Sequence, residues 1–190
     1  QADYRGLLAM SAARMAYKSG RDWRSTAITA IAASVLREAS PEWANWRRGQ
    51  DYYQEGELVW LDADTLIRQK TRDKKSLTDF LHIFLGKGGN TGPLIVPYEF
   101  PEIVADLNQV LPYDWATFFH DRIDNLNPKA DLDGIERGGY KLVYTNKQSA
   151  TEKAVYNSPV YKRYRGAGDV WYSLGLRINS TGTISDVRWG

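Results

Sequence analysis

The feature that most constrains this chain is an apolar stripe along residues 51–71. Its members are Leu58, Val59, Leu61, Ala63, Leu66 and Ile67, with Trp60 beside them. Residues three and four positions apart share one face of an α-helix, so the spacing predicts a long helix with one buried face. Gly56, in its first turns, costs about 1 kcal/mol relative to Ala. A glycine there indicates either close approach of another group or a position without structural demand.

Helical spacing recurs through the first 123 residues. We predict helices over 3–19, 25–38, from Pro41 onward with Trp43 and Trp46, from the capping box Ser76–Asp79 to about Leu85, over 101–110 and over 113–123, with one further turn at 131–136. Residues 94–98 are β-prone but contain Pro97, which favours an edge strand or an extended segment. The expected fold class is therefore mainly α, a bundle-like helical lobe with a few short strands.

The character of the sequence changes after residue 139. Residues 140–145 alternate like a strand, 146–168 are polar with little periodicity, and Ser180-Thr181-Gly182 predicts a β-hairpin of 171–179 with 183–188. A lone hairpin is marginal in water, so we expect further strands beyond Gly190. Gln1-Ala2 is neither an initiator Met nor a signal peptide. We therefore expect a fragment with a helical domain (1–146), a linker (147–170) and the start of a second domain (171–190).

Composition narrows the classes of function. The apolar share of 43% and the aromatic share of 13% suffice for a packed core, and a net charge of +2 gives no general attraction to nucleic acid. The absence of cysteine excludes disulfides, thiolate zinc sites and cysteine nucleophiles. No apolar run approaches the ~18 residues of a membrane span. Basic and aromatic residues interleave over 156–165, which we interpret as a linker packing its tyrosines rather than a nucleic-acid site.

No catalytic or metal-binding constellation is complete in this sequence. The two histidines belong to different predicted helices: we interpret His82 as a core residue and His120 as a surface residue, and neither as a zinc ligand. There is no Gly-x-Ser-x-Gly elbow, and 87–92 lacks the Gly-Lys-Ser/Thr ending of a phosphate loop. One interpretation of four acids of 51–71 (Glu55, Glu57, Asp62 and Asp64) is a carboxylate cluster, but ordinary charges on a solvated helix face explain most of them.

One segment nevertheless resembles a known family. Trp43-x-x-Trp46-Arg47-Arg48-x-x-Asp51-Tyr52-Tyr53-Gln54-Glu55-Gly56-Glu57-Leu58-Val59-Trp60-Leu61-Asp62-x-Asp64-x-Leu66-Ile67-Arg68 looks like a characteristic stretch of the glycyl aminopeptidase family. These gluzincin zinc metallopeptidases join a thermolysin-like catalytic domain to a PDZ domain. Weaker matches follow at 75–80, 112–115, 132–136 and 172–176, so the resemblance covers most of 40–146 and 171–190.

The resemblance implies what the chain belongs to. Residues 1–146 would be the helical C-terminal lobe of the catalytic domain and 171–190 the start of a PDZ-like domain, where Ser173-Leu174-Gly175-Leu176 is similar to the carboxylate-binding loop. The His-Glu-x-x-His zinc motif would lie upstream of Gln1, so zinc is expected in the full-length protein and no metal or cofactor on this chain. The implied substrate is a peptide with N-terminal Gly or Ala, and the chain alone would be inert.

The resemblance also implies a role for Tyr53. Tyr53-Gln54-Glu55-Gly56 is similar to the Tyr-x-Lys-Gly segment of related zinc aminopeptidases, whose tyrosine hydrogen-bonds the oxyanion of the tetrahedral intermediate. A phenol is protonated at pH 7 and can donate to such charge. Two alternatives stay open for the site: Tyr52 as the donor, or Tyr53 packed with Trp46 and Trp60. The alternative for the whole chain is a non-enzymatic helical interaction module.

Overall fold

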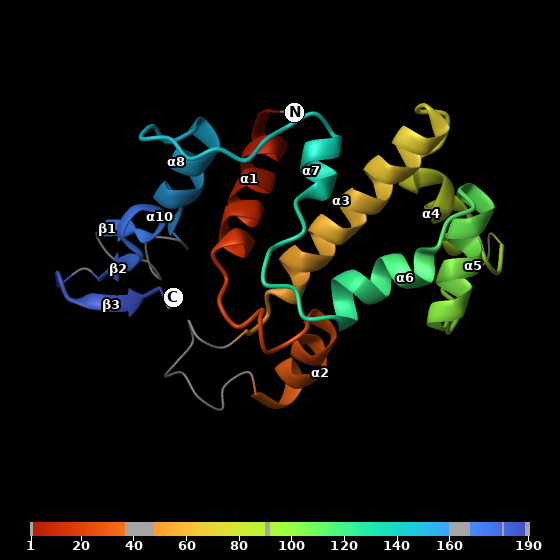
Figure 1. Ribbon diagram of the computed structural model, residues 1–190, viewed down its shortest axis with the longest axis horizontal. Coiled ribbons are helices and arrows are strands. Elements are labelled where there is room, and N and C mark those ends of the chain that lie inside the picture. Colours follow the sequence, from red (N-terminus) through yellow and green to blue (C-terminus); the bar gives the residue numbers. More distant parts are fainter. Residues whose placement is uncertain (1, 37–47, 90–91, 160–167, 180, 189–190) are drawn as a thin grey trace. The chain divides into compact units, whose positions relative to one another are not determined.

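The computed structural model describes residues 2–36, 48–89, 92–159, 168–179 and 181–188 (Figure 1). Its helices are α1 (Ala2–Ala16), α2 (Thr26–Leu36), α3 (Tyr52–Thr71), α4 (Leu77–Leu85), α5 (Phe100–Val110), α6 (Trp115–Phe119), the π-helix η1 (His120–Asp124), α7 (Asp133–Arg137), α8 (Ala150–Asn157) and α10 (Trp171–Leu174). The strands are β1 (Gly168–Val170), β2 (Leu176–Ile178) and β3 (Ile184–Val187). The expectation of a mainly α chain is confirmed, while the predicted helix with Trp43 and Trp46 lies outside the described residues.

The chain divides into two compact units. One comprises 1–54, 126–130 and 142–190, and the other comprises 55–125 and 131–141. Each unit is therefore assembled from segments that are not consecutive in the sequence. Within the described residues, no helix is both long enough and apolar enough to cross a membrane.

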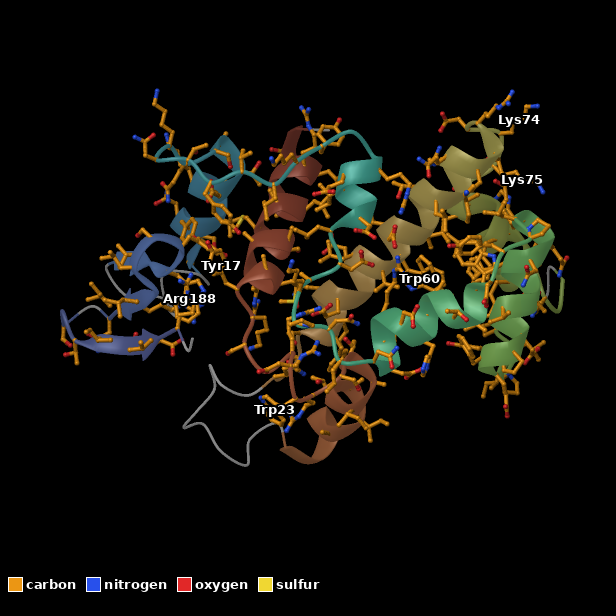
Figure 2. All side chains as sticks on the ribbon, in the orientation of Figure 1. Tyr17, Trp23, Trp60, Lys74, Lys75 and Arg188 are labelled. Carbon is orange, nitrogen blue, oxygen red and sulfur yellow. The ribbon has the colours of Figure 1, made fainter. Side chains whose placement is uncertain are left out.

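The core of the second unit is built on α3. Its buried face consists of Glu55, Leu58, Val59, Asp62, Ala63, Leu66 and Ile67. Phe80 of α4, Leu107 and Val110 of α5, and Trp115, Phe118 and Phe119 of α6 join this core. Trp60 stacks on Phe80 with ring centroids 5.6 Å apart and meets Phe119 edge-on at 5.4 Å (Figure 2). Each large apolar side chain buried here contributes about 1.5–3 kcal/mol, so the predicted stripe does organise the unit.

The turn from α3 to α4 is defined by caps. Ser76 Oγ accepts a hydrogen bond from Thr78 N at 3.2 Å, and Asp79 Oδ2 accepts one from Ser76 N at 2.8 Å, which confirms the predicted capping box. Lys75, at this end of α3 in Figure 2, donates from Nζ to the Val110 carbonyl oxygen at 2.9 Å. A lysine at the last carbonyls of α5 also complements the negative end of that helix dipole.

The predicted helix over 113–123 forms as two helical segments of different pitch. α6 starts at Asp114, whose carboxylate accepts a hydrogen bond from Thr117 N at 3.1 Å. After Phe119 the chain widens into the five-residue π-helix η1. π-Helical turns are rare and often occur at functional positions. The sequence did not predict this change of pitch, and Arg122 belongs to the π-helical segment.

In the first unit, α1 lies directly against α8. A Cβ atom at Gly6 would lie 2.6 Å from the Thr151 Cβ, so only glycine permits this approach of the helices. The ring of Tyr17 meets those of Tyr144 and Tyr172 at 5.5 and 5.7 Å, and the Arg188 guanidinium lies 4.3 Å from its centroid (Figure 2). Burial raises the pKa of Tyr144 to about 12. The stretch 147–170, expected as a linker, thus contains a packed helix.

The strands of the first unit form one antiparallel sheet in the order β1-β2-β3. The predicted hairpin is confirmed as β2 and β3, and Gly182 has the expected positive φ of 82°. Residues 171–174, however, are helix α10, and β1 was not predicted. The strand predicted over 140–145 is wrong. These residues pair with no strand in the described chain. Alternating side chains form a β-strand only where a neighbouring strand accepts and donates the backbone hydrogen bonds.

Gly134 and Gly56 provide a matched stability test. A Cβ at Gly134 would lie 2.5 Å from the Asp62 backbone nitrogen, whereas one at Gly56 would meet no described atom within 4 Å. Gly134→Ala should lower the free energy of unfolding by about 1–3 kcal/mol through overpacking. Gly56→Ala should raise it by up to about 1 kcal/mol through helix propensity. Urea unfolding of both variants measures this, and equal effects would contradict the close contact of α7 with α3.

Candidate functional site

Tyr53, the predicted oxyanion donor, is the second residue of α3. Its side chain is 66% exposed, and its ring lies over that of Tyr52 with centroids 4.7 Å apart. No described residue hydrogen-bonds its hydroxyl group. Trp60 packs against Phe80 and Phe119, and Trp46, the other residue of the packing alternative, lies outside the described residues, so that alternative stays open. The hydroxyl group of Tyr53 is thus available to a ligand.

Glu55 and Gly56, which follow Tyr53 in the motif, have other surroundings than we predicted from the sequence. Glu55 is only 1% exposed and belongs to the buried face of α3, so its interpretation as a solvated charge is wrong. Glu55 lies seven residues before Asp62, on the same stripe as Leu58 and Leu66. That spacing was readable in the sequence and would have indicated two acids at core positions. Gly56 has open space around it and does not mark close approach by a described group.

Asp62 is the centre of a buried ion-pair network. Its side chain is fully buried, which also corrects its interpretation as a solvated charge. Arg122 of η1 donates from Nε to Asp62 Oδ2 at 2.8 Å, and Arg137 of α7 pairs with the same carboxylate. Arg137 Nη1 also donates to the Asp62 carbonyl oxygen and to Thr65 Oγ1, both at 3.1 Å. A buried carboxylate requires such compensation, since an unpaired charge in a core is strongly destabilising.

Arg122 connects this carboxylate to a second one. Its Nε also donates to Asp131 Oδ2 at 3.0 Å, and its Nη1 donates to the Phe118 carbonyl oxygen at 3.2 Å. The guanidinium carbon lies 3.8 Å from the centroid of the Phe118 ring, which is a cation–π contact. The planar guanidinium group of Arg122 makes these hydrogen bonds with several N–H donors in a fixed geometry, which the single ammonium group of a lysine could not reproduce.

The carboxyl group of Asp131 has a raised pKa. Burial and, after it, the negative charge of Asp62 raise the pKa of this carboxyl, Arg122 lowers it, and the net result is a pKa of about 6. The backbone N–H of Asp133 donates to Asp131 Oδ1 at 3.2 Å, which also favours the charged form. The network thus places the buried Asp62 and the half-buried Asp131 around one arginine that both share.

Among the described residues, Asp62, Asp131 and Asp133 are the group whose ligand atoms lie close enough to hold a metal ion. Three carboxylate oxygens suit Mg²⁺ or Ca²⁺ rather than zinc, which prefers nitrogen and sulfur. The Arg122 guanidinium already hydrogen-bonds both Asp62 and Asp131 and lies between them. His82 and His120 do not belong to the group, so the described residues do not fit a zinc site. Both histidines are exposed: this confirms the interpretation of His120, while the core placement of His82 is wrong.

The segment compared with a carboxylate-binding loop is part of a helix end. Ser173 and Leu174 belong to α10, and Gly175 ends it with φ 70° while its N–H donates to the Trp171 carbonyl oxygen at 3.1 Å. That N–H is therefore used within the fold. Neither a scan against protein-family models nor a search of the curated proteins finds a match to this chain.

The Asp62 network gives a stability prediction. Asp62→Ala leaves Arg122 and Arg137 without their shared carboxylate and should lower the free energy of unfolding by about 3–5 kcal/mol. The matched control is Asp124→Ala, which removes an exposed pair with His120 and should cost at most about 1 kcal/mol. Urea denaturation of both variants is the measurement. Similar small losses for the two would show that the network does not hold the unit together.

Asp131 gives a prediction for the dependence of stability on pH. Because its pKa is raised in the folded chain, the folded state binds more protons than the unfolded state between about pH 4 and pH 6. Stability should therefore fall through this window as pH rises, by up to about 3 kcal/mol from this group. Asp131→Asn removes the titration, so unfolding curves of the variant should lack that decrease. An unchanged pH slope in the variant would contradict the raised pKa.

Proposed function

We propose that this chain is the helical C-terminal part of a zinc-dependent metallopeptidase, an aminopeptidase acting on N-terminal Gly or Ala. In this proposal zinc is held by residues outside the 190, residues 171–190 begin a PDZ-like domain, and the described chain contributes one wall of the active-site cleft. The single observation that carries the proposal is the position of Tyr53, exposed at the start of the helix that bears the family-like motif.

The role of Tyr53 follows from its chemistry and its place on α3. Its hydroxyl group donates a hydrogen bond to the negative charge that develops on the carbonyl oxygen of the substrate. The positive end of the helix dipole lies at the first turn of α3, next to Tyr53, and favours the same charge. A helix anchored along seven buried residues also holds its first turn rigidly, which a preorganised donor needs.

The burial of Glu55 removes an objection to this role. Related zinc aminopeptidases have lysine at the corresponding position, and a carboxylate beside the donor would oppose a developing negative charge. Glu55, however, belongs to the buried face of α3, whereas Tyr53 is exposed. The reversal of charge at this position is therefore compatible with an oxyanion donor two residues before it.

The test uses the full-length protein and hydrolysis of Gly- and Ala-p-nitroanilide. Tyr53→Phe should lower kcat by about 10²–10³-fold, because one oxyanion donor is lost. KM and zinc content should stay unchanged, since the ring and its stacking on Tyr52 are retained. The matched control is Tyr4→Phe, which alters another exposed tyrosine, on α1, and should keep full kcat.

Three outcomes separate the parts of the proposal. A full-length protein without zinc and without cleavage would overturn the peptidase assignment and favour a non-enzymatic module. Cleavage with full kcat in Tyr53→Phe would overturn only the role of Tyr53. In that case Tyr52→Phe tests the neighbouring hydroxyl group as the donor.

A further inference from the structure

The chain between α4 and α5 presents apolar side chains to solvent. From Leu94 to Glu99 it runs without helix, turn or bend. Ile95 is 93% exposed, and Leu94 is more than half exposed. An isolated exposed leucine needs no explanation, but three consecutive apolar residues on a straight segment form a surface that other proteins can bind.

The backbone of this segment is also unpaired. The N–H and C=O groups of Leu94, Ile95 and Val96 make no hydrogen bond to any part of the chain that the structure describes. Pro93 and Pro97, which bracket them, have no N–H group. This segment belongs to no sheet of the described chain, but like an edge strand it offers backbone donors and acceptors that are not hydrogen-bonded. Extended peptides bind such edges by adding a strand.

Side-chain contacts with α4 and the residues after it, rather than hydrogen bonds to another strand, hold this segment in place. A Cβ built at Gly88 would lie 3.4 Å from a methyl group of Leu94 and 3.8 Å from one of Val96, so these two side chains face the end of α4. The Tyr98 ring meets Phe84 edge-on at 4.8 Å. Ile95, between the two anchored residues, turns outward, as the alternation of an extended chain requires. This preorganisation reduces the entropy lost when a partner binds.

The acidic residues near Leu94–Val96 indicate the charge that a complementary partner would have. Residues 80–110 contain one lysine, Lys87, and three acids, Glu99, Glu102 and Asp106. Lys87 pairs with Asp106 at 2.6 Å and also lies 3.8 Å from Glu102, so one lysine faces three acids and the net charge of this stretch is negative. A second copy of this chain would bring the same negative charge to the contact. A strand flanked by lysine or arginine is complementary instead.

We propose that Leu94–Val96 is a docking edge for an extended, apolar segment of another protein that is flanked by basic residues. The partner strand hydrogen-bonds the free backbone groups, packs alternate apolar side chains against Ile95, and places its basic ends near Glu99 and Glu102. This inference does not rest on the peptidase assignment, since Tyr53 and the zinc ligands take no part in it.

The test uses the whole chain and a labelled peptide, Lys-Val-Thr-Val-Thr-Val-Lys, in fluorescence anisotropy at low salt. We expect saturable binding that weakens at least about tenfold when alternate backbone nitrogens of the peptide are methylated, because hydrogen bonds of the added strand are lost. Exchange of both lysines for glutamates should weaken binding by a similar factor. Ile95→Asp should weaken it too, whereas the control Ile28→Asp, at an exposed isoleucine on α2, should not.

Several results would overturn the proposal. Equal affinity for the methylated peptide would exclude strand addition, and no binding up to about 1 mM would exclude this partner. Unchanged affinity in Ile95→Asp, with helical circular dichroism retained, would place the binding elsewhere. Sedimentation of the free chain as a dimer that Ile95→Asp dissociates would replace the proposed partner by a second copy of the chain.

Discussion

The pairing of the buried Asp62 carboxylate with two arginines is the interaction on which the second unit depends. A full charge in the apolar face of α3 is tolerated only because Arg122 and Arg137 converge on it from η1 and α7. The same contact sets the geometry of the neighbours. Gly134 brings the backbone of α7 to the backbone of α3, and the π-helical turn presents Arg122. Removing the Asp62 carboxylate would leave both arginines without the partner they share.

This anchoring has a consequence for the beginning of α3. The buried residues begin at Glu55, one turn after the helix starts, so Tyr52 and Tyr53 extend from a part that is fixed by packing. A side chain on such a rigid end can be exposed and still well oriented, which is the property required of a hydrogen-bond donor to a transition state.

The two proposals use different elements and different physics. Tyr53 acts through one hydroxyl group at the positive end of a helix dipole, where a single hydrogen bond is strong because charge develops beside it. The edge at Leu94–Val96 acts through several weak backbone bonds and apolar contacts on a segment fixed by Gly88 and Phe84. An enzyme assignment could therefore fail while the docking edge stands, and the reverse is equally possible.

The sequence by itself determined the mainly α class, the stripe of α3, the Ser76 capping box and the hairpin at Gly182, because each depends on local periodicity or on a local hydrogen bond. The position of Tyr53 at a helix start was also local. The spacing of Glu55 and Asp62 on the stripe indicates core positions, but only the tertiary structure decided that Arg122 and Arg137 pair with Asp62, since these partners lie far along the chain. It likewise decided that 140–145 is no strand and that α8 packs on α1. Strands and buried charges are specified by partners, and a single sequence does not reveal which distant residues will meet.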